Sequence, residues 1–128
     1  MKTKVLMVGT GGYAGVYLNE LLHSEHAAAQ FELVGAVDPY AVQGANYEAL
    51  CAKNVPFFNT VEEFYAAHTA DLAIVVTPIH LHAYQASYCL LHGSHVLCEK
   101  PICSTLEDAE MMIDARDRSG KKLGIGFQ

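Results

Sequence analysis

Positive charge is scarce in this sequence. Its 128 residues include 8 lysines and arginines against 14 aspartates and glutamates, which gives a formal net charge of −6. A protein surface that binds nucleic acid needs clustered lysine and arginine side chains to neutralise phosphates. The charge balance therefore argues against nucleic acid as a partner.

Long apolar runs are missing as well. A membrane-spanning helix needs about 20 consecutive apolar residues, and no stretch of the chain approaches that length. The short apolar run 5–8 is interrupted at once by glycines and no small-residue cleavage site follows it, so it does not resemble a signal peptide. We expect no membrane partner.

The four cysteines form no recognisable motif. Cys51, Cys89, Cys98 and Cys103 lie neither in a C-x-x-C pair nor in the spacing of zinc ligands. Isolated cysteines usually behave as small buried apolar residues, and reduced thiols are typical of the cytoplasm. We therefore predict a cytoplasmic protein without a metal site.

Apolar residues, by contrast, make up 52% of the chain, and a chain of this length suits one domain with a sizeable core. Short apolar runs alternate with segments of helical periodicity. The predicted strands are 4–8, 31–37, 55–58, 72–76, 95–98 and one beginning at 123 and reaching 127; the predicted helices are 13–23, 43–52, 60–67, 80–92 and 104–119. This alternation favours right-handed crossovers and a parallel sheet with helices on both faces. The predicted fold class is α/β, a Rossmann-type doubly wound sheet in three αβα layers, as a single domain over residues 1–128.

A glycine-rich turn follows the first predicted strand. Gly9, Gly11 and Ala14 match G-x-G-x-x-A, a variant of the dinucleotide-binding fingerprint. The first glycine makes the tight turn, the second lets the backbone approach a pyrophosphate, and the alanine lets the helix pack closely on the strand. The helix N-terminus then offers unpaired amides to the phosphates. Gly12 and Tyr13 belong to the same predicted site, where Tyr13 could either cover the pyrophosphate or pack as a helix residue.

An acidic residue ends the second predicted strand. Asp38 lies 24 residues beyond Ala14, the last position of the glycine motif, which is near the spacing of about 20 expected for an acid that binds ribose. A carboxylate there can accept hydrogen bonds from both hydroxyls of the adenosine ribose, and it would repel a 2′-phosphate. We therefore predict NAD as the cofactor and regard NADP as less suited.

Two further motifs occur where later strands end, and ligands bind at that edge of an open α/β sheet. The segment VVTPIHLHAYQASYCLLHGSHVLCEKP, residues 75–101, resembles the glucose-fructose oxidoreductase and inositol dehydrogenase (Gfo/Idh/MocA) family, which shows T-P-x-x-x-H followed by G-x-H-V-x-x-E-K-P. The stretches VGTGGYAG and AVDP resemble the start of that family, so the likeness covers nearly the whole chain. The residues that match the two later motifs are Thr77, Pro78, His82, Gly93, His95, Val96, Glu99, Lys100 and Pro101.

The resemblance implies an NAD(P)-dependent oxidoreductase whose small-molecule substrate is a sugar, a polyol or a related compound. In the family the lysine of E-K-P lies near the nicotinamide and assists proton transfer at the reacting hydroxyl or carbonyl, so Lys100 is the predicted catalytic residue. Glu99 is expected to support the nicotinamide side. The other residues that the resemblance assigns to the cofactor cleft are Thr77, Pro78, His82 and Pro101.

Members of the family continue into a second α/β domain, which supplies the substrate pocket, a further catalytic histidine and much of the dimer interface. Residues 1–128 contain none of it, so the resemblance implies a cofactor-binding domain that is inactive alone and, in the full-length enzyme, is compatible with a homo-oligomer. One alternative is a stand-alone, non-catalytic module that senses NAD. Another Rossmann-like protein, such as an S-adenosylmethionine-binding domain, is a weaker alternative because E-K-P has no role there.

Overall fold

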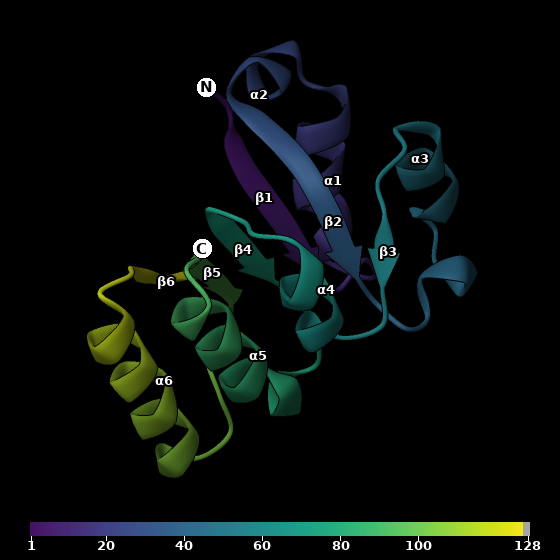
Figure 1. Ribbon diagram of the computed structural model, residues 1–128. Helices are drawn as coiled ribbons and strands as arrows, with labels where there is room; N and C mark the ends of the chain where they lie inside the picture. Colours follow the sequence, from purple (N-terminus) through teal and green to yellow (C-terminus); the bar gives the residue numbers. More distant parts are fainter. Residues whose placement is uncertain (127–128) are drawn as a thin grey trace.

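A six-stranded, wholly parallel sheet forms the centre of the computed structural model, which describes residues 1–126 (Figure 1). The strand order is β3-β2-β1-β4-β5-β6, the order of a doubly wound Rossmann sheet, so the predicted fold class is confirmed. The strands are β1 (Thr3–Val8), β2 (Phe31–Val37), β3 (Phe57–Phe58), β4 (Leu72–Val75), β5 (His95–Glu99) and β6 (Leu123–Gly126). The helices are α1 (Ala14–His23), α2 (Glu25–Gln30), α3 (Tyr47–Ala52), α4 (Val61–Ala67), α5 (Ile79–Leu91) and α6 (Leu106–Ser119), with a 3₁₀ turn η1 at Ala41–Gln43.

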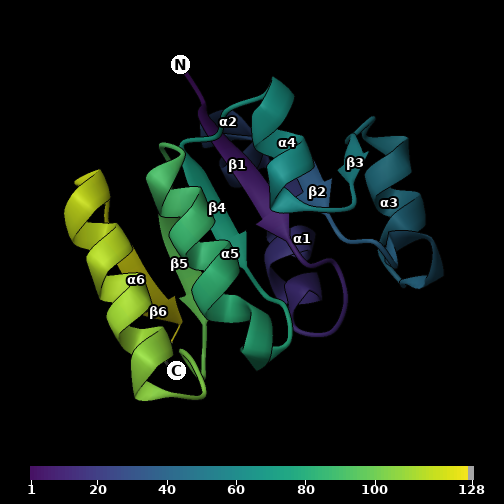
Figure 2. The same ribbon diagram turned by 60° about the horizontal axis from the view of Figure 1, so that its bottom comes forward.

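Helices cover both faces of the sheet, as Figures 1 and 2 show from two directions. On one face α4, α5 and α6 pack over the strands, and on the other face α1 and α3 do so. The central strand β1 shows how this is encoded. Leu6 and Val8 join the core beneath α4–α6, whereas Val5 and Met7 join the core beneath α1, and all four are fully buried. A strand buried on both faces is apolar at every position rather than at every second one.

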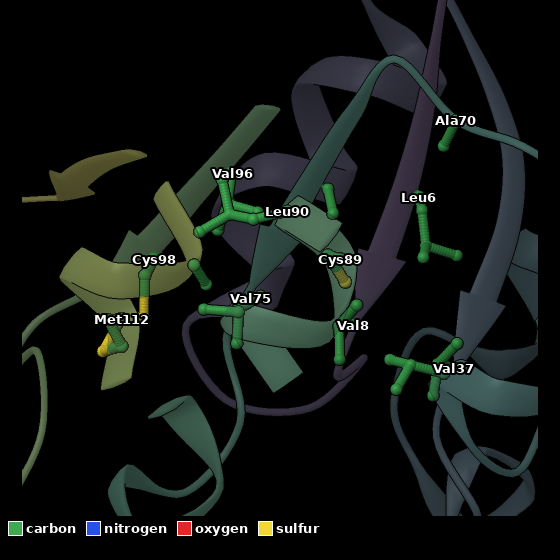
Figure 3. Packing of buried hydrophobic residues seen from close by; sticks show 14 of the residues in the cluster. Leu6, Val8, Val37, Ala70, Val75, Cys89, Leu90, Val96, Cys98 and Met112 are labelled. Carbon is green, nitrogen blue, oxygen red and sulfur yellow. The ribbon is translucent and has the colours of Figure 1, made fainter. Parts of the chain in front are cut away.

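The larger core fills the space between the sheet and α4–α6. Figure 3 shows Val75 and Val96 of neighbouring strands with Leu90 of α5 and Met112 of α6. Strands β4 and β5 pair in parallel, with Val75 opposite Cys98 and Ala73 opposite Val96, so these four side chains face the same core. The helices are thereby fixed relative to the sheet, and so are the loops that lead into them.

Several element boundaries differ from the prediction. Helix α2 was not predicted; it begins because the Ser24 hydroxyl accepts a hydrogen bond from the Ala27 amide at 3.2 Å. The predicted helix 43–52 is an α-helix only over α3, from Tyr47 onward, and η1 overlaps the predicted range only at Gln43. The predicted strand 55–58 pairs only at β3, and the last predicted residue of the final strand, Phe127, lies outside the described residues.

Side-chain caps begin two of the later helices. At α4 the Thr60 hydroxyl accepts from the Glu63 amide at 3.1 Å, the bond that a threonine cap makes with the third residue of a helix. Helix α6 begins two residues later than the predicted helix 104–119, because Thr105 is its cap and the Thr105 hydroxyl accepts from the Asp108 amide at 3.0 Å. Within residues 1–126, no helix is long and apolar enough to cross a membrane.

Two of the thiols predicted to be buried lie in the larger core, at Cys89 and Cys98. Burial is the main cause that raises the pKa of each thiol from 9.0 to about 12. The unfolded chain therefore loses these protons near pH 9 while the folded chain keeps them, so the folded state loses stability as the pH rises from about 9 to about 12. The free energy of unfolding should fall by up to about 1.4 kcal/mol per pH unit for each thiol.

Urea denaturation at pH 8, 9 and 10 measures this effect. The variant Cys98→Ala should show a shallower decline than the wild-type chain, because one of the two titrating groups is gone. Cys51 is exposed, so Cys51→Ala serves as the control and should leave the decline unchanged. Identical slopes for Cys98→Ala and the wild type would contradict the assignment.

Candidate functional site

A hollow of about 530 Å³ lies at the carboxyl ends of β1, β2 and β4. The sheet order reverses beside β1, which has β2 on one side and β4 on the other, so the chain leaves these strands in opposite directions and opens a crevice. Five of the predicted site residues line it: Gly9, Gly11, Asp38, Thr77 and Pro78. The other lining residues are Val37, Pro39, Tyr40, Val76, His80, Leu81 and Gln85.

Gly9 is fixed between two strand ends. Its amide donates to the Val37 carbonyl at 2.8 Å, and its φ of +96° lies in the left-handed region. A Cβ atom at this position would come within 2.6 Å of the Val76 carbonyl oxygen. Only glycine therefore fits here, and the requirement comes from packing against Val76 and not from a ligand.

Gly11 stands in a different environment. A Cβ atom there would have no protein atom within 4 Å, so the space above its backbone is open to the hollow. Among the described residues, the amides of Gly11, Gly12 and Tyr13 donate no hydrogen bond. They immediately precede α1, whose first residue, Ala14, is fully buried. Successive unpaired amides at a helix N-terminus attract anions.

The Asp38 carboxylate also lines the hollow and is bonded to the glycine turn. Its Oδ2 atom accepts from the Thr10 amide at 3.0 Å and from the Thr10 hydroxyl at 2.8 Å, and its Oδ1 atom accepts from the Tyr40 amide at 2.9 Å. A carboxylate offers about four acceptor positions, so capacity remains for a ligand. Asp38 thus holds the glycine turn in place as well as facing the hollow.

Sequence reasoning did not identify Thr10 or Asn46 as parts of this site. The Asn46 side chain reaches from the segment before α3 and donates to the Thr10 carbonyl at 2.7 Å. Thr10 occupies a variable position of the fingerprint, so only the parallel pairing of β1 with β2 could have placed it beside Asp38. No pattern in the sequence points to Asn46.

The loop after β4 also lines the hollow, with Thr77 and Pro78. The Thr77 hydroxyl donates to the Gln85 side-chain oxygen at 2.5 Å, in the second turn of α5. Pro78 is exposed and occupies the cap position of α5. This bond fixes the rotamer of Thr77, and Gln85 is a lining residue that the sequence did not reveal.

His82 does not have the orientation that the family resemblance implied. It is 2% exposed and is not among the residues that line the hollow. Its Nδ1 atom lies 2.9 Å from the Pro101 carbonyl oxygen, and its Nε2 atom lies 2.7 Å from the Thr77 carbonyl oxygen. The ring is directed into the protein because each of its nitrogens lies within hydrogen-bond distance of a backbone carbonyl oxygen.

The segment Cys98–Pro101 ends β5, the strand next to β4, so it lies one strand further along the same edge of the sheet. The Glu99 side chain is buried, and its Oε2 atom accepts from the Tyr17 hydroxyl at 2.6 Å. A Cβ atom at Gly126 would overlap this carboxylate. Burial, followed by the hydrogen bond and the charge of Glu99, raises the pKa of Tyr17 above its ordinary value, so the hydroxyl remains a donor.

Lys100 follows in a bend and is exposed. Within residues 1–126 its side chain takes part in no ion pair, and Pro101 beyond it is exposed as well. The amine is therefore available to a ligand at this edge. Neither Lys100 nor Glu99 lines the hollow, which is confined to the loops after β1, β2 and β4.

Comparison with known proteins gives a consistent result. A family model described as an oxidoreductase family with an NAD-binding Rossmann fold matches residues 3–127. The 1,5-anhydro-D-fructose reductase of Ensifer adhaerens is 38% identical over 95 residues, which are 73% of this chain and 28% of that protein. The glucose-6-phosphate 3-dehydrogenase of Bacillus subtilis is 31% identical over 125 residues, 97% of this chain and 33% of that protein.

Among solved structures, the WlbA dehydrogenase of Bordetella pertussis, crystallised with NADH and UDP-GlcNAcA, superposes with a TM-score of 0.80. It is 29% identical, and the match covers 98% of this chain and 37% of that one. The chain thus spans about a third of the length of the relatives that it matches.

Proposed function

The chain belongs to the Gfo/Idh/MocA oxidoreductase family as its NAD-binding Rossmann domain, and we propose that it binds NAD in the hollow beside β1. The observation that carries this proposal is that two features occur together at the end of β1. Unpaired amides precede α1, and the Asp38 carboxylate lies beside them, bonded to Thr10 and lining the hollow.

The pyrophosphate fits the amides of Gly11, Gly12 and Tyr13. These amides have no acceptor within the described residues, and Gly11 leaves its backbone open to the hollow. The N-terminus of α1 adds partial positive charge at the same point. Tyr13, which is 41% exposed, would flank the phosphates.

The adenosine ribose fits Asp38. Its remaining acceptor capacity suits a ribose hydroxyl, and its negative charge disfavours a 2′-phosphate. No lysine or arginine is among the residues that line the hollow, so neither side chain is present there to neutralise the 2′-phosphate of NADP. We therefore propose NAD rather than NADP as the cofactor.

The nicotinamide end would lie toward the loops after β4 and β5, beside Thr77, Pro78 and Lys100. The bound nicotinamide supplies hydride transfer. We assign Lys100 as the catalytic residue because its amine is exposed at this edge and can exchange a proton with a reacting hydroxyl or carbonyl oxygen. Glu99 and Pro101 would hold the backbone on either side of it.

By analogy with its relatives, we propose a sugar or polyol as the substrate of the whole enzyme, in the cytoplasm. Related proteins are a reductase of 1,5-anhydro-D-fructose and a dehydrogenase of glucose 6-phosphate. Because the chain spans about a third of their length, we propose that residues 1–128 bind cofactor and that turnover needs groups from a second domain.

Titration calorimetry of the chain with NADH, NADPH and S-adenosylmethionine tests the proposal. We expect NADH to bind, NADPH to bind at least about tenfold more weakly because of repulsion by Asp38, and S-adenosylmethionine not to bind. Binding of S-adenosylmethionine alone would refute a dinucleotide site. Equal affinities for NADH and NADPH would refute the choice of NAD.

A further inference from the structure

Lys100 has no contact of its own that fixes it. Its side chain is exposed and forms no ion pair within the described residues. An amine that transfers protons must nevertheless be held near the reacting atom. The backbone on either side of Lys100 must therefore provide the position.

On the N-terminal side the anchor is Glu99. Its buried carboxylate accepts a hydrogen bond from the Tyr17 hydroxyl of α1 at 2.6 Å and packs against Gly126 of β6. Glu99 is also the last residue of β5, paired with Gly126 in the sheet. This side of Lys100 is thus fixed by the sheet and by a charge-assisted hydrogen bond.

On the C-terminal side the anchor is the Pro101 carbonyl, which faces Nδ1 of His82 at 2.9 Å. The other ring nitrogen of His82 faces the Thr77 carbonyl at 2.7 Å. One buried imidazole therefore spans the loop after β4 and the loop after β5. A neutral ring donates to one of the two carbonyls, and a protonated ring donates to both.

These loops carry the groups assigned to the nicotinamide end, and we propose that His82 is a positioning residue that sets Lys100 relative to Thr77. The assignment of these groups rests on the proposed function. His82 does not itself act on a ligand, because both nitrogens face backbone carbonyls and the ring is 2% exposed. Its effect passes through the Pro101 carbonyl to the residue that precedes it.

Backbone ¹⁵N relaxation of the chain tests this inference without any ligand. In the wild type the Lys100 amide should have an order parameter near 0.85, as in rigid backbone, and in His82→Phe it should fall below about 0.6. Phenylalanine fills the space of the ring but donates no hydrogen bond. The order parameters of Met7 and Ile74 in the core strands should stay unchanged.

Two further variants keep the test decisive. His80→Phe changes the exposed neighbour on the same turn of α5 and should leave Lys100 rigid. Should His82→Phe not fold, His82→Gln retains an amide donor and is measured instead, with a smaller decrease expected. Tyr17→Phe removes the other anchor and should also lower the order parameter of Lys100.

Three results would overturn the inference. They are a Lys100 amide that is already mobile in the wild type, one that stays rigid in a folded His82 variant, and an equal loss of order in the core strands, which would give His82 a general role in stability only. The proposed function fails by a different result, the absence of NADH binding to the wild-type chain, so the two failures are distinguishable.

Discussion

Replacing Asp38 with alanine should weaken NADH binding by about 10- to 100-fold, since a hydrogen bond to a charged group contributes about 1.5–3 kcal/mol. The loss has two physical sources. The ribose loses its acceptor, and the glycine turn loses the carboxylate that receives the Thr10 amide and hydroxyl at 3.0 and 2.8 Å. Calorimetry measures the affinity directly.

Asp38→Asn separates the two sources. The amide oxygen can still accept from Thr10, although the Tyr40 amide loses its acceptor, and the negative charge is gone. The preference for NADH over NADPH should therefore narrow while the bonds to Thr10 are kept. Asp117→Ala on α6 is the control, because that carboxylate is exposed and, within residues 1–126, its side chain pairs only with the neighbouring Arg116. An unchanged NADH affinity in Asp38→Ala would remove Asp38 from the site.

Gly9→Ala should lower the free energy of unfolding by about 2–5 kcal/mol, a large part of the 5–15 kcal/mol that holds a typical domain folded. An L-residue at a φ of +96° is strained by about 1–2 kcal/mol. The new methyl group would lie 2.6 Å from the Val76 carbonyl oxygen, and such overpacking costs about 1–3 kcal/mol. Urea denaturation measures the change.

Gly11→Ala is the matched control for stability. Its Cβ atom would have no neighbour within 4 Å and its backbone is outside the left-handed region, so the unfolding free energy should change by less than about 0.5 kcal/mol. Affinity for NADH should nevertheless fall about tenfold or more, because the methyl group occupies the space that a pyrophosphate needs. Equal stability of the two variants would contradict the separate roles assigned to these glycines.

The sequence predicted the order and bounds of the strands and helices better than it predicted the contacts between side chains. Over the described residues, the apolar runs predicted the bounds of five of the six strands to within one residue, because a strand buried on both faces is apolar throughout, as at Val5–Val8. The shortest strand, β3, was predicted too long because its pairing ends after two residues. Helix α2 was missed because a six-residue segment carries too little periodicity to be recognised.

By itself the sequence determined the alternation of strands and helices, the glycine turn and the acid at the end of β2, since these depend on local periodicity and backbone stereochemistry. The tertiary structure alone decided that Tyr17 meets Glu99, 82 residues away, and that His82 turns inward between two carbonyls. These contacts depend on which strands are neighbours in the sheet. That order is set by helix packing across the whole core, which no local pattern specifies.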